Sequence, residues 1–123
     1  MKAKFSKKYS VKKEHSAAKI GSGALEVLST PSMIAFMENA AYELCQENIE
    51  DTNSETTVGI SLEVKHLKAS AISSQIEVKI IDIKQDNKIL SLVIEAYQDD
   101  QLIGQANHQR AVVNIERFMS KLK

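Results

Sequence analysis

The sequence predicts an α+β fold in which one long helix packs against a single antiparallel sheet. Apolar residues recur every three to four positions from residue 31 to residue 48. After the polar segment 51–55 the apolar spacing changes to two, which is the period of a β-strand. A lone amphipathic helix must bury its apolar side, and a sheet wrapped around it provides the surface. We therefore expect a long central helix surrounded by strands, in one domain spanning residues 1–123.

The segment before the helix is expected to begin with a strand from Lys2 to Val11, because Phe5 and Tyr9 alternate there with lysines. Residues 16–20 form a short helical turn or a loop, and the glycines at 21 and 23 interrupt the chain. Residues 24–28 then fit a short strand that leads into the helix.

The central helix is expected to start at Thr30, as the N-cap, with Pro31 at the first helical position. It ends near residues 48–50. Its apolar side carries Ile34, Met37, Ala41, Leu44 and Cys45. Glu38 lies about 40° from Ile34 on a helical projection, at the margin of this apolar side. A carboxylate turned halfway toward a core needs a partner or lines a cavity, so Glu38 is the first candidate site residue.

Four strands and a short final helix are expected after residue 55. The first strand has Val58, Ile60, Leu62 and Val64 on one face, with His66 in phase with them. Residues 67–70 form a crossing segment, and the next three strands cover residues 72–83, 89–97 and 102–113. Polar turns separate these strands at 85–88 and 99–101. Asn114 caps a final helix over residues 115–122. The strands are expected to form an antiparallel meander whose free face or edge invites self-association.

Composition limits the function classes. Sixteen basic residues balance sixteen acidic ones, so no net charge points to a nucleic acid or a membrane surface, and the basic N-terminal dozen residues fit a solvated strand face. The single cysteine, Cys45, excludes an internal disulfide and a multi-cysteine metal site, and its place among apolar residues indicates a core position. We see no signal peptide and no apolar run long enough to cross a membrane, so we expect a cytoplasmic protein.

Three side chains could form a site for acyl transfer or hydrolysis. Thr30 and Glu38 are eight residues apart and point in the same general direction along the helix. His66 lies on the strand that is expected to pack beside it. A hydroxyl, a carboxylate and an imidazole can supply a nucleophile, a base and a proton relay. Each residue also has a plain structural explanation, as a helix cap, a solvated carboxylate and a hydrogen-bonded core histidine.

Several separated motifs resemble the hot-dog-fold acyl-CoA thioesterases, in particular the fluoroacetyl-CoA thioesterase branch. The motifs are the Thr-Pro at residue 30, the glutamate at 38, a Val-Gly at 58–59 with a His-Leu at 66–67, and the late segment Gly104 to Arg110 with its His-x-Arg. The resemblance covers most of the chain from residue 24 onward. Fluoroacetyl-specific members have aromatic residues upstream of the Thr-Pro, whereas residues 21–29 here contain none.

The resemblance implies a hot-dog fold, with a long helix wrapped by a five-stranded sheet, and a homodimer or larger assembly with sites near the subunit interface. It implies that Thr30, Glu38 and His66 are catalytic, that Gly59 lies close to the thioester carbonyl, and that Arg110 and His108 bind the substrate. The expected reaction is hydrolysis of a small or medium acyl-CoA to the free acid and CoA. CoA enters as part of the substrate, and no other cofactor or metal is expected.

Other interpretations stay open from the sequence. The chain could be an acyl-CoA binding module that keeps the pocket without turnover. A hot-dog hydratase is a second alternative, although the expected Asp and His spacing is absent. A third is a dimer without a ligand, in which Glu38 and His66 pair in the core.

Overall fold

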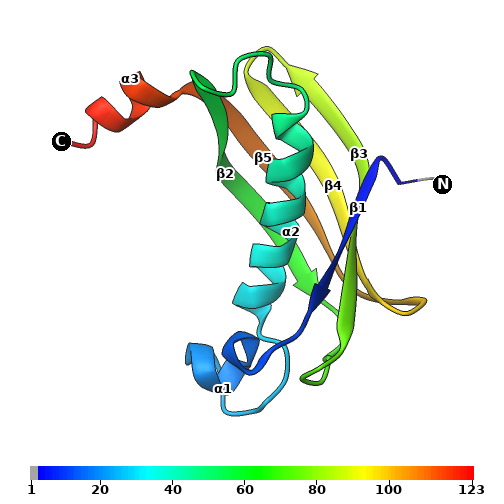
Figure 1. Cartoon of the computed structure of the whole chain (residues 1–123). Coiled ribbons are helices and arrows are strands. Elements are labelled where there is room, and N and C mark those ends of the chain that lie inside the picture. The colour runs from blue at the N-terminus through cyan, green and yellow to red at the C-terminus, as the bar shows by residue number, and fades with distance from the viewer. Residues whose placement is uncertain (1–2) are drawn as a thin grey trace.

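A computed structural model describes residues 3–123 and shows one long helix, α2 (Thr30–Gln46), inside a curved five-stranded antiparallel sheet (Figure 1). The predicted architecture is therefore confirmed. The predicted first strand reaches back to Lys2, which lies outside the described residues. The strands are β1 (Phe5–Ser10), β2 (Glu55–His66), β3 (Gln75–Asp86), β4 (Ile89–Gln98) and β5 (Gln101–Asn114). The shorter helices are the 3-10 turn η1 (Lys13–His15), α1 (Ala17–Ile20) and α3 (Ile115–Ser120).

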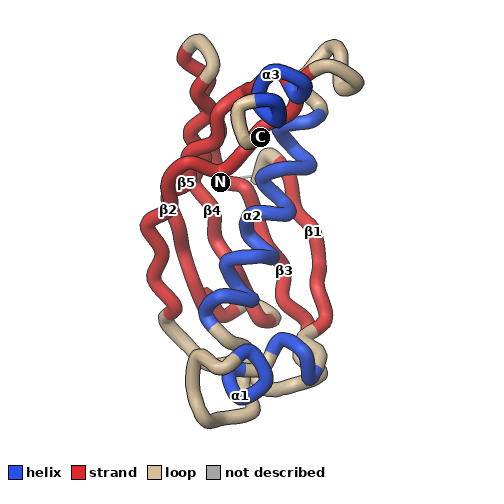
Figure 2. Tube along the Cα trace, turned by 90° about the vertical axis from the view of Figure 1, so that its left-hand side faces the viewer, coloured by secondary structure: helices blue, strands red, loops and turns tan. Residues whose placement is uncertain are grey.

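The strand order is β1-β3-β4-β5-β2, so β2 is an edge strand and pairs with β5, not with β3. The expected four-strand meander holds only for β3, β4 and β5. Residues 67–74 carry the chain from β2 across the end of the sheet to β3. Figure 2 shows the result from the side, with α2 lying along the strands and both edge strands free. The two hairpins of the meander are tight, because Asn87 and Asp99 adopt positive φ angles of 58° and 54° in two-residue loops.

The N-cap of helix α2 lies one residue earlier than the sequence predicts. Ser29 is the N-cap, and its hydroxyl accepts a hydrogen bond from the Ser32 N–H at 3.1 Å. Thr30 is therefore the first helical residue, and its side chain is free for another contact. The buried side of α2 packs on the sheet through Met33, Met37 and other apolar residues, and Cys45 lies in this core as a free thiol.

The face assignment of β2 is wrong in its first half. A β-bulge between Gly59 and Ser61 inserts Ile60 as an extra residue opposite β5. Beyond the bulge, Leu62, Val64 and His66 face the helix, as expected. Before it, the inward residues are Thr57 and Gly59, and Ile60 is 51% exposed. The alternation of Val58 and Ile60 with Leu62 in the sequence therefore does not mark one face.

The segment between α1 and α2 forms no strand. Residues 24–28 contribute only two isolated bridges, one between Val27 and Ala71 and one between Leu28 and Ser16. The final helix follows the prediction, because the Asn114 side chain accepts from the Arg117 N–H at 2.9 Å, although it ends at Ser120. Within residues 3–123, no helix has the length and apolar character needed to cross a membrane.

Candidate active site

The first part of the candidate site lies where α2 begins. Thr30, exposed at the start of the helix, has its Oγ1 2.8 Å from Nδ1 of His66 at the end of β2. The two residues are 36 positions apart in sequence. The hydrogen bond forms because the N-cap role belongs to Ser29, which leaves the threonine hydroxyl to the imidazole. The predicted proximity of this hydroxyl and this imidazole is found in the structure.

A cleft of about 290 Å³ opens beside this pair, lined by the segment Val27–Thr30 on one side and His66–Ala69 on the other. The Nε2 atom of His66 is buried and has no hydrogen-bond partner among the described residues. Burial lowers the pKa of His66, and the main chain at Lys68 partly offsets this effect. The imidazole is therefore neutral near pH 7, which is the form that can accept a proton.

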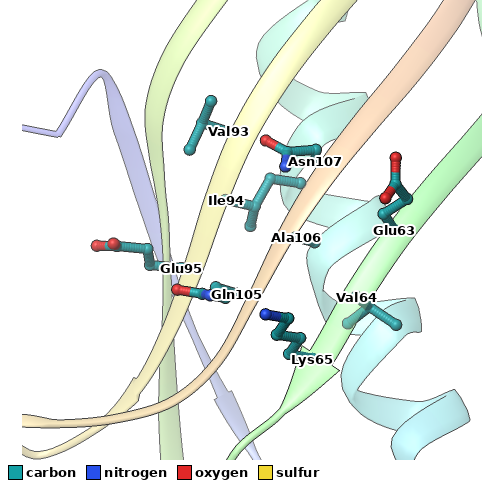
Figure 3. Close-up of a pocket in the computed structure, with 9 residues that line it drawn as sticks. All are labelled: Glu63, Val64, Lys65, Val93, Ile94, Glu95, Gln105, Ala106 and Asn107. Carbon is teal, nitrogen blue, oxygen red and sulfur yellow. The ribbon is translucent and has the colours of Figure 1, made fainter.

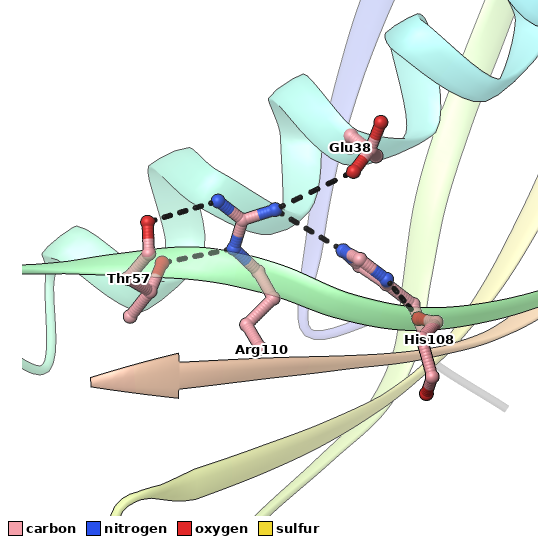
Figure 4. Close-up of polar contacts among 5 residues, drawn as sticks. Glu38, Thr57, His108 and Arg110 are labelled. Carbon is pink, nitrogen blue, oxygen red and sulfur yellow. Dashed lines mark hydrogen bonds and ion pairs between the residues drawn. The ribbon is translucent and has the colours of Figure 1, made fainter. Parts of the chain in front are cut away.

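The second part of the site is a polar network between α2 and the strands β2 and β5 (Figure 4). Arg110 on β5 is 7% exposed, and three hydrogen bonds hold its guanidinium. Its Nε donates to Thr57 Oγ1 at 2.8 Å, and its Nη2 donates to the Thr57 carbonyl at 3.1 Å. Its Nη1 lies 3.1 Å from Nε2 of His108. A buried cation needs such partners, because an unpaired charge in the core is costly.

His108 is almost fully buried, with 2% of its surface exposed. Its Nδ1 lies 2.8 Å from the Ser61 carbonyl oxygen. Burial is the main cause that lowers the pKa of His108. The Ser61 carbonyl opposes this effect, the Arg110 charge adds to it, and Glu38 opposes it. Burial thus favours the neutral form of both histidines of the candidate site by lowering their pKa values.

Glu38 points into this second group. Its Oε2 lies 4.0 Å from Arg110 Nη1, and its side chain is 44% exposed. Gly59 faces it directly: a Cβ atom built on this glycine would lie 2.8 Å from Oε2 of the carboxylate and 3.2 Å from Cε1 of His108. A side chain at residue 59 would therefore occupy the space in front of the carboxylate. The prediction that Glu38 lies at the margin of the buried side of α2 is confirmed.

The structure thus divides the predicted site residues into two groups. Thr30 and His66 form one, and Glu38, Gly59, His108 and Arg110 form the other. Eight residues of helix separate Thr30 from Glu38, which corresponds to roughly 12 Å along the axis. No hydrogen bond joins Glu38 to either member of the first group in the part of the chain that is described. One chain alone does not bring the carboxylate to the hydroxyl and the imidazole.

Thr57 is the member of the network that sequence reasoning missed. It is buried and provides two of the three acceptors that hold Arg110. The bulge hides it, because a regular alternation counted back from His66 places Val58 and not Thr57 toward the helix. A buried arginine requires hydrogen-bond acceptors, so an acceptor side chain near Arg110 was to be expected on the neighbouring strand.

A hollow of about 450 Å³ lies away from both groups, on the sheet face opposite α2 (Figure 3). Glu63 and Lys65 of β2, Glu95 of β4 and Gln105 and Asn107 of β5 surround it. None of the predicted site residues lines this hollow. In residues 3–123 no group of three or more His, Cys, Asp or Glu side chains is arranged to hold a metal ion.

Comparison with solved structures identifies proteins of the same fold. The structure is similar to a variant of the fluoroacetyl-CoA-specific thioesterase FlK, with 23% identity, 99% of this chain and 95% of that chain covered, and a TM-score of 0.87. It is similar to a thioesterase-superfamily protein of Thermus thermophilus (20% identity, 96% and 88% covered, TM-score 0.85). A hot-dog-like protein of Thermanaerovibrio acidaminovorans gives 15% identity, 95% and 85% coverage, and a TM-score of 0.80. No curated protein matches the sequence.

The architecture is therefore that of the hot-dog class, as the sequence predicted. Residues 11–116 match the family described as fluoroacetyl-CoA-specific thioesterase (FlK), and the chain belongs to this family. Its activity is hydrolysis of an acyl-CoA thioester, as predicted.

Proposed function

We propose that the chain hydrolyses a short acyl-CoA at the cleft beside Thr30 and His66. The observation that carries this proposal is the 2.8 Å contact between the threonine hydroxyl and an imidazole that is kept neutral, at the mouth of a cleft and at the N-terminal end of the long helix. The positive end of the helix dipole favours the negative charge that develops on the thioester oxygen during attack.

The proposed reaction uses Glu38 as the base and His66 as the proton relay. Water gives a proton to the carboxylate as its oxygen bonds to the carbonyl carbon. The proton passes to the imidazole of His66, the C–S bond breaks, and the leaving sulfur takes the proton to give the CoA thiol. Thr30 fixes the imidazole through Nδ1, and Gly59 leaves room for the acyl group in front of the carboxylate. No metal or second cofactor takes part in this scheme.

The distance between the two groups leads us to propose a homodimer with shared sites. Strand β2 is a free edge, and Ile60 and Leu67 on or just beyond it are exposed. When a second copy pairs antiparallel along β2 about a two-fold axis, the first half of one strand lies beside the second half of the other. Gly59, which faces Glu38, belongs to the first half, and His66, which contacts Thr30, ends the second. The carboxylate of one copy then lies on the side of the partner's hydroxyl and imidazole.

A short aliphatic acyl group fits the cleft. Its volume of about 290 Å³ is at the small end of ligand pockets, which commonly run from about 300 to 1,000 Å³. The loop above it presents Leu25, which is 67% exposed, and residues 21–29 contain no aromatic side chain. We therefore propose a substrate without a specific fluorine requirement. The balanced charge and the reduced, buried Cys45 support a cytoplasmic location.

Release of free thiol from a panel of short, branched, aromatic and long acyl-CoAs tests the proposal. We expect turnover of short acyl groups, a marked reduction of this turnover in Thr30→Ala, and its loss in His66→Ala. CoA binding without any turnover would instead identify an acyl-CoA binding module.

Mixing two inactive variants tests the shared site. Glu38→Ala and His66→Ala chains, unfolded together and refolded, form heterodimers in which one of the two sites retains both an intact carboxylate and an intact imidazole. We expect activity to reappear in the mixture, up to about one quarter of the wild-type value if chains pair at random. A mixture that stays inactive, although dimers form, would place the whole site within one chain.

A further inference from the structure

His108 and Arg110 form a network that the proposed chemistry does not use directly. Both side chains are nearly fully buried, so neither is placed to bind the CoA chain at the surface. Figure 4 shows Arg110 between His108 and the Glu38 carboxylate: a hydrogen bond joins Arg110 to His108, and an ion pair joins it to Glu38. On its other side, His108 contacts the Ser61 carbonyl.

The acceptors in this network fix the proton on His108. The Ser61 oxygen is a carbonyl and only accepts, so the Nδ1 atom 2.8 Å away carries the hydrogen and donates it. The guanidinium of Arg110 only donates, so the Nε2 atom 3.1 Å from Nη1 must be the acceptor with a free lone pair. The ring is therefore the neutral Nδ1–H tautomer. A second proton on Nε2 would remove the acceptor and place two cations in contact.

The same contacts fix the orientation of Arg110. Thr57 accepts from Nε and Nη2, and His108 accepts from Nη1. The lone pair of His108 is the acceptor that orients the Nη1 end of the guanidinium, which is the end that lies 4.0 Å from Glu38 Oε2. If His108 could not accept this hydrogen bond, only the two hydrogen bonds to Thr57 would hold the guanidinium.

We propose that His108 is a positioning residue that acts through Arg110 to hold the Glu38 carboxylate in front of Gly59. Its lone pair at Nε2 orients the guanidinium, and the guanidinium charge holds a carboxylate that would otherwise move freely in solvent. This inference rests on the proposed function insofar as Glu38 is the base. It assigns His108 a role inside the protein in place of the substrate contact that the family resemblance implied.

Two substitutions separate this role from a merely structural one. In His108→Gln the side-chain oxygen lies near the former Nε2 position and can still accept from Arg110, but the donor to Ser61 is lost. In His108→Asn the side-chain NH₂ lies near the former Nδ1 position and can still donate to Ser61, but the acceptor for Arg110 is lost. Each variant breaks one of the two hydrogen bonds, so each is a control for the loss of stability in the other.

We expect kcat for thiol release to stay within about threefold of wild type in His108→Gln and to fall about tenfold or more in His108→Asn. Arg110→Lys should also lower kcat, and it should cost little more when added to His108→Asn, because both changes remove the same interaction. Equal or better turnover by His108→Asn would overturn the proposal. Additive losses in the double variant would do the same.

Nitrogen NMR of the histidine side chains gives a readout that does not need activity. The Nδ1–H tautomer of His108 at neutral pH supports the proposal, and an Nε2–H or doubly protonated ring overturns it. The Arg110 Nη1 hydrogens, which donate to His108, should stay protected from exchange in His108→Gln and lose this protection in His108→Asn, whereas the Nε–H held by Thr57 should be unchanged in both. A wild-type protein that releases no thiol from any acyl-CoA overturns the proposed function, and the tautomer then decides on the His108–Arg110 contact alone.

Discussion

Replacing Gly59 by alanine tests whether the position of the Glu38 carboxylate controls turnover. The new methyl group would lie 2.8 Å from Glu38 Oε2, whereas ordinary contact begins near 3.4 Å, so the oxygen must move by about 0.6 Å or more. The imidazole of His108 at 3.2 Å is buried and hydrogen-bonded, and it yields less easily. The half-exposed carboxylate is the part that moves.

Gly59→Ala should have a small effect on stability and a large effect on turnover. Overpacking in a core costs about 1–3 kcal/mol, and we expect about 1 kcal/mol here because the nearest atom is the end of a flexible side chain. That corresponds to a fall of about 4 °C in the melting temperature for a chain of this length. Misplacement of a reacting group by about 1 Å can cost about 100-fold in rate, so kcat/KM should fall by one to two orders of magnitude.

Steady-state thiol release and thermal unfolding of Gly59→Ala measure both quantities. In the double variant with Glu38→Asp, whose side chain is one methylene shorter, stability should return while activity stays low. Gly23→Ala is the control, since its methyl would meet only the Ala17 Cβ at 3.3 Å. Wild-type kcat/KM in Gly59→Ala would refute the reasoning, because the carboxylate could then be displaced without effect.

Three further predictions concern the start of α2 and the two histidines of the candidate site. Thr30→Ala should lower kcat about tenfold or more through loss of the 2.8 Å contact to His66, with Thr30→Ser restoring most of it in the thiol-release assay. Ser29→Ala should instead lower the free energy of unfolding by about 1 kcal/mol in urea titrations, because it removes the N-cap; an unchanged stability would contradict this. Burial lowers the pKa values of His66 and His108, so the unfolded chain binds protons more readily, and the free energy of unfolding should fall as the pH drops below about 6.5. Replacing both histidines by glutamine should flatten this part of the stability curve.

The fold could be predicted because its main elements have strong local signals. The spacing of Met37, Ala41 and Leu44 indicates a long helix, and the polar residues at 87 and 99 mark turns that adopt positive φ angles. No local pattern in the sequence predicts that β2 lies at the edge of the sheet, because the strand order depends on where residues 67–74 cross the sheet. Pairing of β2 with β5 is decided by long-range packing.

The candidate site could be predicted residue by residue, but not as an arrangement. Each side chain named from the sequence lies near α2, yet Thr30 and Glu38 belong to different groups because the helix places them about two turns apart. The hydrogen-bond partner of Arg110, Thr57, could not be predicted from the sequence for a different reason. The bulge turns Thr57 inward, and an alternating pattern cannot reveal an extra residue in a strand.

The bulge at Ile60 also determines which changes of chain length this protein can tolerate. Removing Ile60 turns β2 into a regular strand in which Thr57 and Gly59 still face the helix together with His66. Removing a residue from the regular part of the strand, such as Glu63, instead turns one half of these side chains to the opposite face. Relatives with one residue fewer between the glycine and the histidine could therefore keep the same site, and sequence spacing alone would wrongly exclude them. A folded, active Ile60 deletion beside an unfolded Glu63 deletion would demonstrate this difference.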